Sequence, residues 1–127
     1  MDLITSDNRI VIDVGSTNDM ESFYLTARRG MGRDVQGVRL ALAFLQSGAC
    51  KSKDAMETAR QLNLVRDRLA SIPPIDAVIN SESLADLSPV ATSCANLFMT
   101  ADGMDLTAEL VRMLVYAGAV GVDIRVA

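Results

Sequence analysis

The sequence predicts an α/β fold, a small sheet with helices packed against it, and an α+β arrangement is the alternative. Two observations support this prediction. Short runs that favour β-structure lie toward both ends of the chain, and apolar residues recur at helical spacing in its middle. With 127 residues, half of them hydrophobic, the chain is expected to form a single domain over residues 1–127 with a sizeable core.

The first predicted strand is RIVIDV at residues 9–14, where apolar and polar side chains alternate. The Gly-Ser-Thr-Asn run at residues 15–18 is expected to end it. Within MESFYLTARR at residues 20–29, Phe, Tyr and Thr favour a second strand over SFYLTA. The Asn-Asp start and the glycine after this segment also suit a short helix, so both interpretations stay open.

Two helices are predicted next. The first runs from Asp34, which can cap it, to Gly48, which can close it. The second starts at Ser52 and ends before Pro73-Pro74, because a helix cannot continue through that pair. Since few residues join them, the two helices should pack as an antiparallel hairpin. The inward residues of the second helix are expected to be Met56, Ala59, Leu62, Val65 and Leu69.

The C-terminal part predicts a βαβ unit. Residues 75–91 favour neither helix nor strand, but CANLFMT at residues 94–100 is expected to form a strand and Asp102-Gly103 a turn. DLTAELVRMLVYAG at residues 105–118 is then a helix, and VDIRV at residues 122–126 a closing strand. With turns this short, that order favours two parallel strands joined by the helix.

The composition argues against an enzyme. The chain has no histidine, which removes the commonest general base, every Ser-His or Cys-His nucleophile pair, and a Cys/His zinc site. Cys50 and Cys94 lie far apart without a C-x-x-C pair, so we expect free thiols that behave as small apolar residues. No catalytic residue, metal or cofactor is therefore expected.

Charge is distributed unevenly along the chain. Residues 1–27 carry five acids against one base, residues 28–72 nine bases against four acids, and residues 73–127 seven acids against two bases. A net charge of −4 argues against nucleic acid as a partner, because phosphate binding needs a basic face. The N-terminus lacks the apolar core of a secretory signal, and LVRMLVYAGAV is too short to span a bilayer. We expect a cytoplasmic protein with no nucleic-acid or membrane partner.

The stretch IVIDVGSTN at residues 10–18 resembles the first phosphate loop of the actin and sugar-kinase superfamily. In that loop Asp13 would sit near a metal, and Gly15 would let backbone N–H groups approach phosphate oxygens. The superfamily also needs a second phosphate loop and two full domains, which this length does not supply. We favour a strand running into a turn, with a small nucleotide- or phosphate-binding domain as an alternative.

Carboxylates gather in the C-terminal third. Their spacing does not match a calcium loop, and acids in a first helical turn complement the helix dipole, where Glu109 can also pair with Arg112. A further interpretation is an acidic surface that contacts a partner. The predicted contact residues are Glu82, Asp86, Asp102, Asp105 and Glu109.

Residues 88–117, SPVATSCANLFMTADGMDLTAELVRMLVYA, with the closing strand, resemble the C-terminal part of some immunity proteins of bacterial contact-dependent growth inhibition and polymorphic toxin systems. The resemblance implies a protein that binds and neutralises a cognate toxin domain, often a nuclease with a basic cleft. It assigns no functional residue. A last alternative is a non-catalytic scaffold, for example a homodimer formed through a sheet edge or an apolar helix face.

Overall fold

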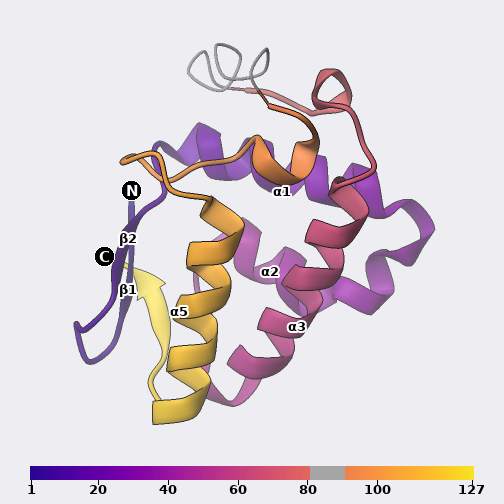
Figure 1. Cartoon of the computed structure of the whole chain (residues 1–127). Helices are drawn as coiled ribbons and strands as arrows, with labels where there is room; N and C mark the ends of the chain where they lie inside the picture. Colours follow the sequence, from indigo (N-terminus) through magenta and orange to yellow (C-terminus); the bar gives the residue numbers. More distant parts are fainter. Residues whose placement is uncertain (81–90) are drawn as a thin grey trace.

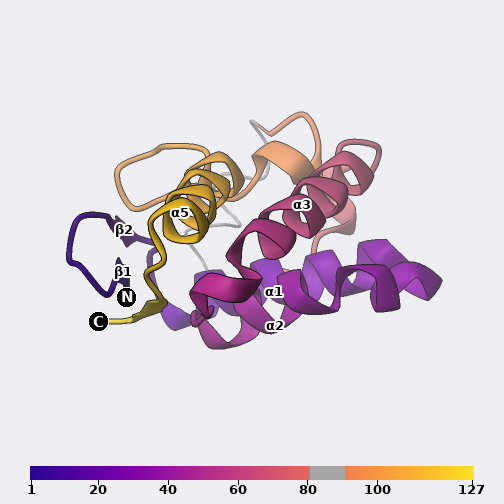
Figure 2. The ribbon, with the colours of Figure 1, turned by 90° about the horizontal axis from the view of Figure 1, so that it is seen from below.

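The computed structural model describes residues 1–80 and 91–127 and shows a mixed α+β fold, the alternative of the two predicted classes (Figure 1). Helices α3 and α5 form one layer and α1 and α2 a second, with the sheet at one side of both (Figure 2). The main elements are β1 (Asp2–Thr5), β2 (Val11–Asp13), α1 (Thr17–Met31), α2 (Arg39–Ser47), α3 (Ser52–Leu69), α5 (Leu106–Val120) and β3 (Ile124–Val126).

The sheet has three antiparallel strands in the order β2-β1-β3. Its central strand, β1, was not predicted from the sequence. The register places Leu3 opposite Ile12 on one side and opposite Val126 on the other. Leu3 and Ile12 are buried, so this face of the sheet joins the helical core.

The strand expected over SFYLTA is wrong, and the helical alternative for that segment is confirmed as part of α1. Ser16 and Asp19 form a capping box: the Ser16 hydroxyl accepts from the Asp19 N–H at 3.1 Å, and the Asp19 carboxylate accepts from the Ser16 N–H at 2.7 Å. Met20, Phe23 and Ala27 then fall on one buried helical face. Capping and burial together outweigh the β-propensity of Phe and Tyr.

The predicted helical hairpin is confirmed as α2 and α3. The predicted start at Asp34 is wrong: Asp34 lies within a 3-10 helix at Gly32–Val38, and α2 begins at Arg39. Gly48, at φ +72°, closes α2 in the left-handed conformation, as expected. The inward side of α3 is as predicted except for Met56, which is 54% exposed. Met56 instead lies over Gly118 of α5, where a Cβ would come within 2.6 Å of the Met56 Cγ.

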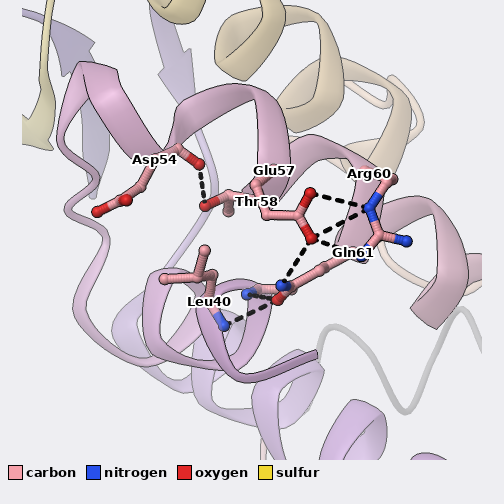
Figure 3. Close-up of polar contacts among 7 residues, drawn as sticks. Leu40, Asp54, Glu57, Thr58, Arg60 and Gln61 are labelled. Atoms are coloured by element: carbon pink, nitrogen blue, oxygen red, sulfur yellow. Dashed lines mark hydrogen bonds and ion pairs between the residues drawn. The ribbon is translucent and has the colours of Figure 1, made fainter. Parts of the chain in front are cut away.

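The N-terminus of α2 is capped from α3 (Figure 3). No side chain at the start of α2 accepts its first N–H groups. The Gln61 Oε1 takes that role, accepting from the Leu40 N–H at 2.8 Å and the Ala41 N–H at 3.2 Å. The Gln61 amide nitrogen in turn donates to Glu57 at 3.2 Å. The Gln61 side chain thus ties the start of α2 to the middle of α3.

The strand expected at residues 94–100 is wrong, and no parallel βαβ unit forms there. Cys94–Asn96 make a 3-10 turn capped by Ser93, and Met99 makes only an isolated bridge to Asp105. The Phe98 ring stacks on Phe23 of α1 at 4.7 Å, which ties this segment to the helices rather than to the sheet. The predicted C-terminal helix is confirmed as α5, but β3 pairs antiparallel with β1.

Candidate functional site

Three of the five predicted contact acids lie in the part of the chain that the structure describes. Glu82 and Asp86 fall outside the described residues. Asp102 lies in the turn before α5, Asp105 is the N-cap of α5, and Glu109 lies in its first turn.

The Asp105 carboxylate is engaged within the fold. Its Oδ1 accepts from the Ala108 N–H at 3.1 Å, which caps α5, and its Oδ2 accepts from the Arg66 guanidinium of α3 at 2.8 Å. Both oxygens therefore have partners on the helices, and the side chain points toward α3. Asp105 has a clear structural role, and its contact with a partner protein stays a prediction.

Asp102 and Glu109 come together in a hollow of about 620 Å³ at the outer edge of β2, here called the acidic hollow. It combines residues from the two ends of the chain, which are the two acidic blocks of the sequence. The side chains that line it are Asp2, Val11, Ile12, Asp13, Thr100, Ala101, Asp102, Met104, Glu109 and Arg112.

A backbone contact joins the two sides of the acidic hollow. The Ala101 N–H donates to the Asp13 carbonyl at 2.9 Å, which brings the turn before α5 against β2. Asp2 lies opposite Asp13 in the β1–β2 register, so both aspartates reach the same site. Asp2 was not among the predicted contact residues because β1 was not predicted, and Asp13 was a candidate site residue only as part of a phosphate loop.

Carboxylates outnumber cations in the acidic hollow. Among the described residues, four acids, Asp2, Asp13, Asp102 and Glu109, line it with a single guanidinium, that of Arg112, which pairs with Glu109 as predicted. The amino group of Met1 lies 3.8 Å from the Asp13 carboxylate and offsets part of one further charge. The Thr100 hydroxyl donates to Asp102. The hollow therefore keeps an excess of negative charge, which favours a cationic group.

The Asp-x-Gly-Ser-Thr segment does not present its N–H groups to a phosphate. The Gly15 N–H donates to the Asp13 carboxylate at 2.9 Å, and the Ser16 N–H donates to the Asp19 carboxylate at 2.7 Å. Two carboxylates thus occupy the donors that a phosphate would need and would also repel it. The segment works as the end of β2 and the cap of α1, which favours the interpretation as a strand running into a turn.

The two cysteines are free thiols, as predicted, but the expected burial holds only for Cys94, since Cys50 is half-buried. Cys94 is fully buried and its Sγ donates to the Pro73 carbonyl at 3.3 Å. Burial raises the pKa of both thiols, with the carboxylate of Asp76 adding to the effect at Cys94. A raised pKa keeps the sulfur protonated at neutral pH, which suits structural residues rather than nucleophiles.

Across residues 1–80 and 91–127, no three His, Cys, Asp or Glu side chains lie close enough together to hold a metal ion. No helix in these two ranges has the length and apolar character to cross a membrane.

A charged, concave surface at a sheet edge is suited to contact with an oppositely charged partner. The family model of immunity protein 70 matches residues 5–126, nearly the whole chain, so the chain belongs to the immunity protein 70 family. No curated protein and no solved structure matches it significantly. Family membership confirms the resemblance to immunity proteins, which bind and neutralise cognate toxins and are typically non-catalytic inhibitors.

Proposed function

We propose that the protein neutralises a cognate nuclease toxin of a contact-dependent inhibition system by binding its toxic domain in the cytoplasm. The binding surface in this proposal is acidic, and Asp102 and Glu109 form its described centre. Membership of the immunity protein 70 family supports the inhibitory role. The single observation that supports the surface is the excess of carboxylates over cations in the acidic hollow.

Charge complementarity connects this surface with the proposed class of toxin. A nuclease holds a phosphate backbone and therefore carries a basic cleft. An acidic surface attracts such a cleft over a distance of about 10 Å at moderate salt, and so speeds the encounter. Fast association matters for an inhibitor, since each free toxin molecule damages its target until it is bound.

Glu82, Asp86 and Asp105, the other predicted contact acids, are proposed to have different roles. Glu82 and Asp86 remain proposed contacts on the same acidic segment of the chain. Asp105 is proposed to contribute mainly by fixing the start of α5, on which Glu109 is placed.

A kinetic comparison with the toxin domain encoded beside this protein tests the proposal. Asp102→Lys combined with Glu109→Lys is expected to lower the association rate at least about tenfold at low salt, with a smaller difference at high salt. Glu21→Lys combined with Asp67→Lys makes the same change in net charge at two exposed acids away from the hollow, and serves as the control. Failure of the wild-type protein to form a complex with that domain would refute the proposed function.

A further inference from the structure

The outer edge of β2 is open at Val11. The Thr5 N–H donates to the Ile10 carbonyl and the Val14 N–H to the Met1 carbonyl, each at 3.0 Å. Hydrogen-bonded pairs alternate along an antiparallel ladder, so the pair Leu3 and Ile12 is bonded and the N–H and C=O of Val11 point outward. Within the described ranges no hydrogen bond reaches these two groups.

The rest of this edge shows how a chain segment pairs with it. The Asp13 carbonyl points the same way as the Val11 groups and already accepts from the Ala101 N–H at 2.9 Å. The turn before α5 thus covers one end of the edge and does not bond to the backbone groups of Val11. One residue of an added extended segment can exchange both backbone hydrogen bonds with Val11.

Apolar side chains flank the acids at this edge. Val11 is 53% exposed and Met104 is 52% exposed, and both line the acidic hollow. An occupant with apolar surface beside a positive charge fits such a lining. Lys and Arg have this character, because a long aliphatic stem carries the charged head.

The free protein holds like charges opposite each other here. Asp2 and Asp13 are cross-strand neighbours in a non-hydrogen-bonded pair, where Cβ atoms are about 4.5–5.5 Å apart and like charges destabilise the sheet. A cationic group that enters the hollow relieves this repulsion. The charge pattern therefore selects a basic occupant over an acidic or neutral one.

We infer that the toxin domain seats an extended basic segment on the edge of β2, pairing with Val11 and placing a Lys or Arg side chain in the acidic hollow. This inference rests on the proposed function and names the part of the partner that β2 and the hollow receive. It assigns contact roles to Asp2, Asp13 and Val11, in addition to Asp102 and Glu109.

Equilibrium binding of the toxin domain to two charge variants tests the side-chain contact. Asp2→Asn with Asp13→Asn removes two charges from the hollow and keeps an oxygen that can accept from the Gly15 N–H. We expect binding to weaken at least about tenfold. Glu21→Gln with Asp67→Asn removes two charges elsewhere on the surface and should change binding less than about twofold. The melting temperature of the free hollow variant should be unchanged or higher, since like-charge repulsion is removed.

A second pair of variants tests the backbone contact. Val11→Pro removes the outward N–H, a change that an edge strand tolerates, and should weaken binding several-fold. Val11→Thr keeps the N–H and the β-branched shape, and should bind nearly as the wild type does.

The outcomes separate the inference from the proposed function. If the wild-type protein forms no complex with the toxin domain, the proposed function fails and the inference fails with it. If the complex forms but the hollow and control variants weaken it equally, or not at all, only the inference is overturned. Self-association of the free protein that Val11→Pro abolishes would assign this edge to a second copy of the chain and would also overturn the inference.

Discussion

Polar groups are arranged in opposite ways in the α2–α3 hairpin and at the edge of β2. In the hairpin they meet complementary partners: Arg60 pairs with Glu57, and Arg68 pairs with Asp34, where the chain enters α2. Gln61 satisfies the first N–H groups of α2. At the edge of β2, Asp2 faces Asp13, and carboxylates outnumber cations.

This difference separates polar residues that stabilise the fold from those available to a partner. Pairing and capping account for the hairpin residues, so their substitution should lower stability. In the described structure the Met1 amino group and the Gly15 N–H offset part of the Asp13 charge, but no salt bridge reaches Asp2, so substitution of this pair should change stability little and impair binding.

The largest effect on stability is expected at Gln61, which is only 8% exposed. Gln61→Leu leaves the N–H groups of Leu40 and Ala41 without an acceptor, and should lower the free energy of unfolding by about 2–3 kcal/mol. Chemical denaturation measures this change. The control is Gln46→Leu at an exposed position of α2, and equal losses for the two variants would contradict the capping role.

A smaller loss of stability is expected at Asp105, which caps α5 and pairs with Arg66 of α3. Asp105→Ala removes the cap of α5 and the ion pair to Arg66, and should cost about 1–2 kcal/mol of stability. Asp102→Ala, in the turn that precedes α5, should lower the free energy of unfolding much less. If Asp105→Ala left stability unchanged but abolished toxin binding, Asp105 would belong with the binding residues instead.

The smallest effect is a pH dependence. The Arg60 guanidinium, with help from the Gln61 amide, lowers the pKa of Glu57 from 4.5 to about 2. Since the pKa is lower in the folded protein, this carboxylate contributes stability above pH 4.5 that is lost as the pH falls toward 2. Glu57 is exposed, so solvent screening keeps the contribution small.

Urea unfolding of the wild type and of Glu57→Gln at several pH values between 5 and 2 tests this expectation. The stability of the variant should fall less steeply with acid than that of the wild type. Parallel curves would show that the ion pair adds nothing to folding. Asp7, whose pKa Tyr116 and Thr5 also lower, contributes equally to both curves and does not affect the comparison.

Regular periodicity made α2, α3 and α5 predictable from the sequence. Their apolar residues recur at helical spacing, and Gly48 and the Pro73-Pro74 pair mark where helices end. Local strand propensity gave wrong predictions for segments whose secondary structure is decided by helix capping or by long-range contacts. SFYLTA has strand-forming residues but lies behind a capping box, and Phe98 is held by Phe23, which is far away in sequence.

The candidate site could be predicted only in part for the same reason. Charge along the chain identified Asp102 and Glu109, because both lie in the acidic C-terminal block. The partnership with Asp2 and Asp13 depends on the register of β1 against β2 and on the contact of Ala101 with Asp13. Both are long-range features that local sequence patterns do not encode.

Residue-resolved amide hydrogen exchange, with and without the toxin domain, tests most directly whether the edge of β2 is the binding surface. In the free protein the outward Val11 N–H has no acceptor among residues 1–80 and 91–127 and should exchange rapidly, whereas the paired Ile12 N–H should be protected. In the complex, Val11 and residues 100–104 should become strongly protected, with little change in α2 and α3. Protection confined to the α2–α3 hairpin, with Val11 still exchanging rapidly, would contradict this account.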